Sequence, residues 1–281
     1  MDKRMNYGSD FKSIPATSIS SGSGISVLPD LYCHTIQIVN IHLVGNPNSG
    51  DFILVDAGMP NSADEIISVT EERFGKNSRP KAIILTHGHF DHVGAIIELI
   101  NHWKVPVYAH ELELPFLTGL KRYPEPDSSV EGGMVAKMSK MFPNEPVNLG
   151  DNVEKLPADG SIPYMPDFSW VHTPGHSPGH ISLFREKDRS LIAGDAFVTV
   201  KQDELYKVLT QKQEINGPPR YLTTDWIAAK NSVSKLAALK PLVAATGHGL
   251  PMTGDLLSDS MEKLVREFDN IAIPDHGKYI D

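Results

Sequence analysis

Apolar and polar positions alternate along this chain in short segments that predict strands and helices in succession. Strands are predicted over residues 25–28, 32–44, 52–55, 81–85, 105–108, 168–172, 181–184, 190–193 and 242–245. Helices, from apolar residues at helical spacing, are predicted over residues 62–73, 93–103, 225–239 and 255–269. Strands that alternate with helices throughout a chain indicate a layered α/β architecture.

Terminal signals support two of the predicted helices. Asn61 or Ser62 can cap the first helix with a side-chain oxygen, and Gly75 can stop it. Thr224 can cap the helix over residues 225–239 in the same way. These residues set the expected ends of the two helices.

Residues 111–166 interrupt the alternation. The segment holds eight prolines, so packed regular elements should be scarce in it. One short helix is predicted over residues 129–142, where Ser128 and Glu131 match a capping box. Three methionines of this helix share one face: Met134, Met138 and Met141. We interpret the face as core packing, with a substrate lid as the alternative.

Composition excludes several classes of protein. The formal net charge of −9 disfavours a nucleic-acid partner, because phosphate binding favours a basic face. The single cysteine, Cys33, excludes an intrachain disulfide and a thiolate-rich metal site. No segment has the composition of a membrane span or a secretion signal, so we expect a cytoplasmic protein without a membrane partner.

The chain is expected to form a single domain over residues 25–281. Residues 1–24 are predicted to be a loosely ordered lead-in, because their second half is rich in serine and glycine. Two insertions within the domain, residues 111–166 and 201–221, are expected to be loop-like.

Residues that can bind a metal gather directly after the predicted strand of residues 81–85. His87, His89 and His92 lie with Asp91 inside six positions. Neutral imidazole and carboxylate are ligands that zinc, iron and manganese accept. Since positions i and i+2 do not share a face of a helix, His87 and His89 can converge on one metal only from an extended loop. Three histidines and an aspartate in so short a loop disfavour the alternative of solvated side chains.

Three further segments carry candidate ligands: Thr173-Pro174-Gly175-His176, Gly194-Asp195 and Gly247-His248-Gly249. His172 and His180 compete with His176, but the prolines and glycines between them prevent the helix that would align all three. His172 lies in a strand pattern and is interpreted as a packing or ligand-orienting residue. His180 is interpreted either as a structural residue or as a substrate contact.

The ordered set of these segments resembles the motifs of the metallo-β-lactamase superfamily. The matching stations are His87-x-His89-x-Asp91-His92, His176, Gly194-Asp195 and Gly247-His248-Gly249, preceded by the Val-Asp-Ala-Gly turn at Asp56. The resemblance extends from about residue 25 to the end. It implies an α/β fold, a four-layer αββα sandwich of the metallo-β-lactamase type, with a two-metal site at one edge.

The resemblance also implies the ligand set. Six residues would each serve one metal: His87, His89 and His176 the first, and Asp91, His92 and His248 the second. Asp195 would bridge the metals, and Asp56 would hydrogen-bond a ligand and fix its orientation. The cofactor is therefore expected to be two divalent ions, zinc in the first place, with Mn²⁺ or Fe²⁺ as alternatives.

The implied chemistry is hydrolysis. Two metals roughly 3.5–4 Å apart can share a water and lower its pKa from about 15.7 toward 7, which supplies hydroxide at neutral pH. Asp91 or Asp195 could return a proton to the leaving group, so both are candidate catalytic residues. Esters, thioesters, lactones, amides and phosphodiesters all fit such a site.

Departures from individual branches of the superfamily narrow the substrate. Asp195, together with the lack of a suitably placed cysteine, argues against a β-lactam. Similar lactonases carry a tyrosine three positions after the bridging aspartate, where this chain has Val198. The residues after Asp195 match poorly to the glutathione-binding residues of glyoxalase II enzymes. The net charge of −9 argues against a nuclease, because a nuclease binds a negatively charged substrate.

Two other classes of function stay open. Relatives similar to persulfide dioxygenases hold one iron and use oxygen, and the ligands alone do not separate them from hydrolases. A binding protein with a vestigial site is disfavoured, because every expected ligand is present.

Substrate recognition is expected in the two insertions. Tyr206 could supply a hydroxyl, as could Tyr164 or Tyr221, and the stiff turn before Arg220 could aim its guanidinium at an anionic substrate. A solvated arginine on a surface turn is the alternative. We expect a small-molecule substrate and leave a homodimer open.

Overall fold

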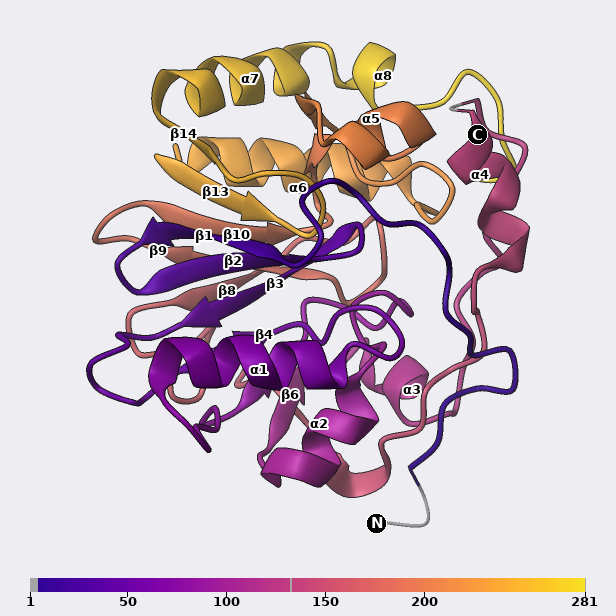
Figure 1. Cartoon of the computed structure of the whole chain (residues 1–281). Coiled ribbons are helices and arrows are strands. Elements are labelled where there is room, and N and C mark those ends of the chain that lie inside the picture. Colours follow the sequence, from indigo (N-terminus) through magenta and orange to yellow (C-terminus); the bar gives the residue numbers. More distant parts are fainter. Residues whose placement is uncertain (1–4, 132, 281) are drawn as a thin grey trace. The chain divides into compact units, whose positions relative to one another are not determined.

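The structure is a computed structural model that describes residues 5–131 and 133–280, so residues 1–4 of the predicted lead-in and residue 132 of the predicted helix lie outside it. The chain divides into two compact units (Figure 1). Unit 1 comprises Met1–Tyr123 and Pro143–Met165, and unit 2 comprises Pro124–Phe142 and Pro166–Asp281. A single domain over residues 25–281 stays a prediction.

Unit 1 contains a seven-stranded sheet. Its strands follow chain order: β1 (Ser23–Leu28), β2 (Leu31–Ile36), β3 (Val39–Val44), β4 (Ile53–Val55), β5 (Ile83–Ile84), β6 (Val107–Ala109) and β7 (Val153–Lys155). Strands β1 to β4 pair antiparallel, and β4 to β7 pair parallel. The parallel half places the ends of β4 and β5 side by side, where Asp56 and the histidine-rich loop follow.

The single strand predicted over residues 32–44 is wrong, because the structure forms a hairpin there. Strands β2 and β3 pair with Ile36 opposite Val39. The chain turns at Gln37, whose φ of +57° lies in the left-handed region. A turn without glycine, asparagine or proline inside an apolar run leaves no sequence signal.

Helices α1 (Ala63–Phe74) and α2 (Ile96–Trp103) pack against each other in unit 1, which also holds the short helix α3 (Leu114–Leu117). Helix α2 begins three residues later than predicted. The backbone N–H groups of Gly94 and Ala95 donate instead to the carbonyl oxygens of Gly58 and Ala57, at 2.8 and 3.1 Å. These bonds tie the loop after β5 to the loop after β4.

Unit 2 contains a five-stranded sheet and a two-stranded ribbon. The sheet runs in the order β14 (Met252–Thr253), β13 (Val243–Thr246), β10 (Ser190–Gly194), β9 (Ile181–Arg185) and β8 (Ser169–His172). The ribbon pairs β11 (Val198–Val200) with β12 (Gln213–Asn216). Only β10 and β13 are parallel within the sheet, so their carboxyl ends meet at one edge.

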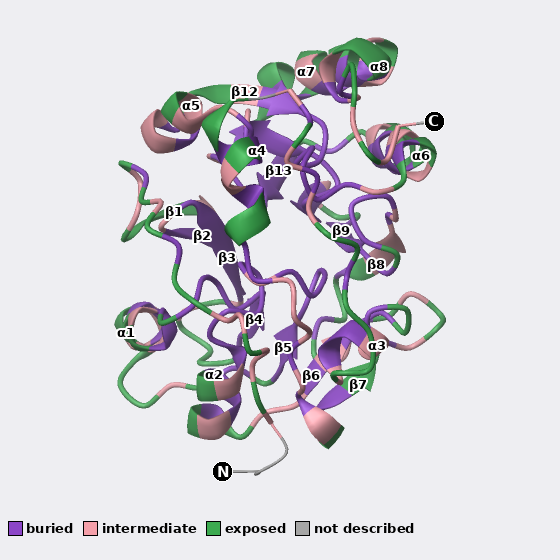
Figure 2. Cartoon of the chain, turned by 90° about the vertical axis from the view of Figure 1, so that its right-hand side faces the viewer, coloured by how far each residue is buried: buried purple, intermediate pink, exposed green. Residues whose placement is uncertain are grey.

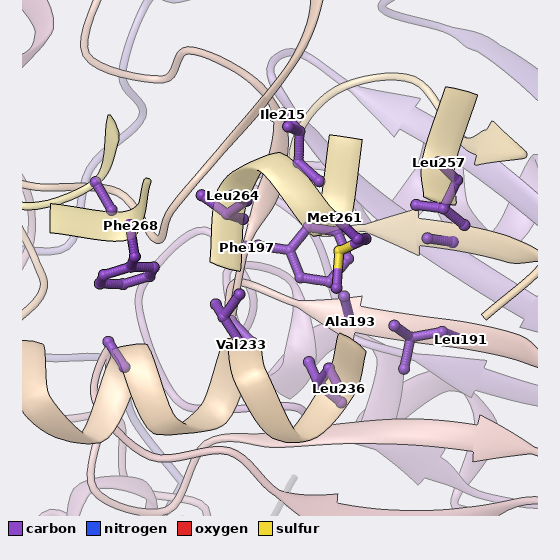
Figure 3. Packing of buried hydrophobic residues seen from close by; sticks show 14 of the residues in the cluster. Leu191, Ala193, Phe197, Ile215, Val233, Leu236, Leu257, Met261, Leu264 and Phe268 are labelled. Atoms are coloured by element: carbon purple, nitrogen blue, oxygen red, sulfur yellow. The ribbon is translucent and has the colours of Figure 1, made fainter. Parts of the chain in front are cut away.

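Helices α6 (Trp226–Ala238) and α7 (Gly254–Arg266) pack against each other in unit 2, and α8 (Phe268–Ile271) follows α7. Figure 3 shows Val233 of α6 and Leu264 of α7 pointing toward Phe197, inside a buried apolar cluster. In Figure 2 the strands are mostly buried, while the helices expose their outer faces. The amphipathic spacing that predicts these helices thus corresponds to real buried faces.

The two insertions contain more regular structure than expected. Residues 201–221 include helix α5 (Leu205–Thr210) and strand β12. Residues 111–166 include α3, α4 (Met134–Met138), two short 3-10 helices (Ser139–Met141 and Gly150–Asn152) and β7. Short elements of this kind carry too few residues for a periodic pattern to emerge.

The predicted capping box is wrong, and so is the interpretation of the methionine face as core packing. The Glu131 carboxylate accepts hydrogen bonds from the Arg220 guanidinium and the backbone N–H of Asp275, both at 2.8 Å, and the helix begins only at Met134. Met134 and Met141 are 58% and 52% exposed. The face that α4 buries carries Val135 and Ala136 instead.

Candidate metal centre

The histidine-rich loop of unit 1 is buried and contains no helix, which the ligand spacing requires. It follows β5 and closes in a turn, where the backbone N–H of His92 donates to the His89 carbonyl at 2.9 Å. The ring centroid of His87 lies 4.7 Å from the centroid of His89 and 4.2 Å from the centroid of His92. Asp91 is buried in the same loop. Unit 1 therefore gathers the three predicted imidazoles and the predicted carboxylate of this motif.

Asp56 holds this loop from the neighbouring strand. Its Oδ1 accepts the backbone N–H of Thr86 at 2.7 Å, and its Oδ2 accepts the Thr86 hydroxyl at 2.8 Å. Nδ1 of His92 lies 2.8 Å from the same Oδ2. All three residues are buried. The contacts agree with the ligand-orienting role predicted for Asp56.

These bonds define the tautomers of two histidines. A carboxylate only accepts, so His92 carries its proton on Nδ1. The Thr86 hydroxyl donates its hydrogen bond to Asp56. Its oxygen therefore accepts a hydrogen bond from Nδ1 of His87, at 3.1 Å. In both rings Nε2 is then the atom with the lone pair that a metal requires.

Glu113 and Tyr123 also hold the loop, and the sequence analysis singles out neither of them. The backbone N–H of Gly88 lies 3.0 Å from a Glu113 carboxylate oxygen and 3.0 Å from the Tyr123 hydroxyl, which itself donates to Glu113. The Tyr123 ring stands 4.4 Å from the ring of His89. Burial, and then the Glu113 charge, raise the pKa of Tyr123 well above its usual value, so the phenol stays protonated.

Gly88 is confined by these neighbours. A Cβ at this position would lie 2.7 Å from the Tyr123 hydroxyl and 3.0 Å from Cδ2 of Leu117. The tyrosine thus approaches the loop so closely that only glycine fits without a shift. Glu113 and Tyr123 both belong to the proline-rich segment, where no pattern singles them out.

The three predicted ligands of unit 2 lie on three different turns. His176 occupies the turn between β8 and β9, Asp195 follows β10, and His248 follows β13. The parallel pairing of β10 with β13 brings the last two turns to the same edge of the sheet (Figure 1). The backbone N–H of Gly247 donates to the Gly194 carbonyl at 2.8 Å and joins these turns.

One carboxylate oxygen is the focus of this group. Nε2 of His176 lies 3.5 Å, and Nε2 of His248 3.2 Å, from Oδ2 of Asp195. All three side chains are almost completely buried. Two imidazoles therefore converge on one oxygen of a buried carboxylate.

The outer nitrogens of both imidazoles are engaged. Thr223 donates its hydroxyl proton to the Pro219 carbonyl at 2.8 Å, so its oxygen accepts from Nδ1 of His176 at 3.1 Å. Nε2 of the Gln202 amide lies 3.1 Å from Nδ1 of His248. The contact holds the His248 ring in place, and its donor and acceptor depend on the tautomer of the ring. For His176, the bond to Thr223 leaves Nε2 with the lone pair, as in His87 and His92 of unit 1.

The remaining candidates occupy other environments. Tyr206 is 75% exposed on α5, so a contact with substrate stays a prediction. Arg220 is buried, not solvated: its guanidinium donates to Glu131 and to the carbonyl oxygens of Ile271 and Ala272 at 2.8–2.9 Å. A substrate contact of Arg220 would have to break these bonds.

Among residues 5–131 and 133–280, the structure has no helix that is long and apolar enough to cross a membrane.

Comparisons with known proteins give the fold and the family. A family model described as the metallo-beta-lactamase superfamily matches residues 34–248. A probable metallo-hydrolase of Bacillus subtilis, YflN, is 46% identical over 259 residues, which is 92% of this chain and 98% of that protein. A hydroxyacylglutathione hydrolase of Erwinia tasmaniensis is 29% identical over 185 residues, which is 66% of this chain and 54% of that protein.

Solved structures agree. A protein crystallised in a di-iron-bound form, TTHA1623, has 27% sequence identity and a TM-score of 0.53, with 79% of this chain and 93% of that chain covered. A subclass B3 metallo-beta-lactamase of Bradyrhizobium japonicum, BJP-1, has 19% identity and a TM-score of 0.60, with 90% and 94% covered. The predicted metallo-β-lactamase fold is confirmed.

Proposed function

The chain belongs to the metallo-β-lactamase superfamily and is a metallo-hydrolase of that family, and from this premise we propose that it binds two divalent metals and cleaves an ester, thioester or lactone of a small molecule. The donor set of the two units fits such metals. Buried imidazoles and buried carboxylates are ligands for zinc, iron and manganese, and hydrogen bonds orient the rings of His87, His92 and His176.

The proposed ligands are those of the superfamily's pattern. His87, His89 and His176 would hold one metal, and Asp91, His92 and His248 would hold the other. Asp195 would be shared by both. The convergence of His176 and His248 on one oxygen of Asp195 is the observation that carries this proposal, because each histidine is assigned to a different metal.

The chain's own residues then have distinct roles. Asp56 and Thr86 keep the Nε2 atoms of His87 and His92 available, and Thr223 does the same for His176. Bound divalent ions would supply Lewis acidity and lower the pKa of water toward about 7. Asp91 or Asp195 would take up the proton that the attacking water loses and return it to the leaving group.

The relatives support the bond type and leave the metal open. A relative named hydroxyacylglutathione hydrolase favours an acyl substrate. Zinc is our first assignment, because its preference for nitrogen and oxygen ligands matches the set. The di-iron-bound relative favours iron as the alternative. A small-molecule substrate, the absence of a nucleic-acid or membrane partner and a cytoplasmic location remain predictions.

One experiment separates the candidate reactions. The purified protein is analysed for metals and then offered a panel of esters, thioesters, lactones and phosphodiesters, with persulfides under oxygen as a separate arm. Two metals per chain with turnover of an acyl substrate support the proposal. One iron per chain with oxygen uptake would instead identify a dioxygenase, and turnover of phosphodiesters alone a phosphodiesterase.

Exchange of residues 124–142 tests where the substrate is recognised. The segment bears the exposed Met134 and Met141 but lacks every proposed ligand, and it excludes Glu113 and Tyr123, which hold the histidine-rich loop. Its replacement should change substrate preference and leave metal content unchanged. Unchanged preference would remove this segment from substrate recognition.

A further inference from the structure

The turn that carries His176 closes at its base with a pair of polar side chains. The turn connects β8 to β9, and the backbone N–H of Thr173 donates to the His180 carbonyl at 2.9 Å. The Thr173 hydroxyl lies 2.9 Å from Nδ1 of His180. Both residues are buried. The base of this turn is therefore polar inside the unit.

A chain of hydrogen bonds runs from this base to the turn that carries Asp195. The backbone N–H of Asp195 donates to Nε2 of His180 at 2.9 Å. Because Nε2 accepts, the neutral ring carries its proton on Nδ1 and donates it to Thr173. The Thr173 and Ser182 hydroxyls lie 3.1 Å apart, and Ser182 donates to the Ala193 carbonyl at 2.8 Å. Each donor in the chain thus has an acceptor.

This chain of hydrogen bonds holds the Asp195 turn at two points. Strand β10 ends at Gly194, whose φ is +54°, and the Ala196 N–H returns to the Ala193 carbonyl at 3.3 Å. The Ser182 hydroxyl holds the Ala193 carbonyl, and His180 holds the Asp195 N–H. A buried N–H without an acceptor is costly, so His180 stabilises the turn in this one conformation.

We propose that His180 is a positioning residue for Asp195: through Thr173 and Ser182 it couples the turn that carries His176 to the turn that carries the bridging carboxylate. The inference rests on the proposed two-metal function. His180 is not one of the proposed metal ligands. It holds the backbone that carries the Asp195 carboxylate, as outer residues of metal sites commonly do.

His172 provides the natural comparison. It lies four residues before His176, as His180 lies four after it. Its Nε2 meets the Pro178 carbonyl at 2.9 Å, within the same loop, and the residue is partly exposed. This bond lies within one loop, whereas the Nε2 atom of His180 reaches the turn that carries Asp195.

The test compares four variants in the metal-loaded protein. His180→Phe removes the acceptor, and His172→Phe is the matched control. Thr173→Val removes the hydroxyl of the relay, and Thr173→Ser retains it. Metal affinity is measured by competition with a chromogenic chelator, and the visible spectrum of the cobalt-substituted protein reports the ligand arrangement.

We expect His180→Phe to weaken metal binding 10- to 100-fold and Thr173→Val to weaken it by about tenfold, both with altered cobalt spectra. Thr173→Ser and His172→Phe should stay within about twofold of the wild type. Should His180→Phe not fold, the Thr173 pair still decides. Two tightly bound metals and an unchanged spectrum in Thr173→Val would overturn the role of the relay, and the same result in His180→Phe would overturn the proposal. A wild-type protein that binds fewer than two metals would instead refute the proposed function.

Discussion

Oδ2 of Asp56 lies 2.8 Å from Nδ1 of His92, and neither side chain is exposed to solvent. The same oxygen accepts the Thr86 hydroxyl, while Oδ1 accepts the Thr86 backbone N–H. A single carboxylate thus sets the tautomer of His92 directly and that of His87 through Thr86. The orientation of two proposed ligands depends on this one side chain.

Asp56→Asn should weaken metal binding 10- to 100-fold. The amide nitrogen would face Nδ1 of His92 and the Thr86 hydroxyl, which are donors, and His92 would move its proton to Nε2. Asparagine tolerates the φ of +62° at this position, so the backbone should persist. Chelator competition measures the effect.

Asp51→Asn is the control for this change. Asp51 is an exposed aspartate paired with Lys81, so its replacement should leave metal affinity unchanged. Equal affinities in Asp56→Asn and the wild type would contradict the orienting role of Asp56.

Gly88→Ala should destabilise the histidine-rich loop, and Tyr123→Phe should relieve much of that effect. The added methyl group meets the Tyr123 hydroxyl at 2.7 Å, the closest contact at this position. In the double variant that oxygen is gone and Cδ2 of Leu117, at 3.0 Å, is the next neighbour. A cycle of the two single variants and the double variant, followed by chemical unfolding, should show coupling of about 1 kcal/mol. If the losses in the free energy of unfolding were additive, the strain in Gly88→Ala would not come from the Tyr123 hydroxyl.

How far the sequence predicts the fold depends on the length of each pattern. The apolar faces of α1, α6 and α7 extend over three turns or more. Each of these helices begins within about two residues of its predicted first residue. The hairpin at Gln37 and the late start of α2 were missed, because a side chain in the left-handed region and backbone bonds from Gly94 leave no periodic trace.

The candidate site divides in a similar way. The ligand types stand in recognisable motifs, since His87 to His92 are close in sequence and His176, Asp195 and His248 sit in glycine turns. Their orienting partners do not. Thr223 is 47 positions from His176, and Gln202 is 46 from His248. Such partners are fixed by tertiary structure, and an ordinary threonine or glutamine gives no sign of the role.

His42 should make the protein less stable as the pH falls. Its imidazole is completely buried in unit 1, and desolvation lowers its pKa from 6.5 to about 4, against a smaller opposing effect of the Asp56 charge. Below about pH 6.5 the His42 imidazole binds a proton in the unfolded chain, whereas in the folded protein it binds one only near pH 4. The penalty is therefore absent above pH 6.5, grows between pH 6.5 and 4, and reaches about 3 kcal/mol.

The comparison of the wild type with His42→Leu isolates this effect. Unfolding free energies of both metal-free proteins are measured from pH 7 to pH 4, so that loss of metal does not contribute. As the pH falls across that window, the free energy of unfolding of the variant should rise relative to that of the wild type. Parallel curves would show that His42 does not titrate as described.

Arg220→Ala should lower the stability of the protein by about 3 kcal/mol, because Glu131 loses its arginine partner and two carbonyl oxygens lose the guanidinium donor. Arg266→Ala, which removes an exposed pair with Glu267, should cost less than about 1 kcal/mol. Chemical unfolding gives both values. A raised KM without loss of stability in Arg220→Ala would identify a substrate contact instead.

Metal content of the purified protein is the most direct test of the two-metal site. Elemental analysis of the wild type and of Asp195→Ala, after equal exposure to zinc and removal of the excess, measures the metals that each chain retains. The ligand set predicts two metals per chain in the wild type and loss of at least one in the variant. A single metal in the wild type, or two in Asp195→Ala, would contradict the bridging carboxylate on which the proposed chemistry depends.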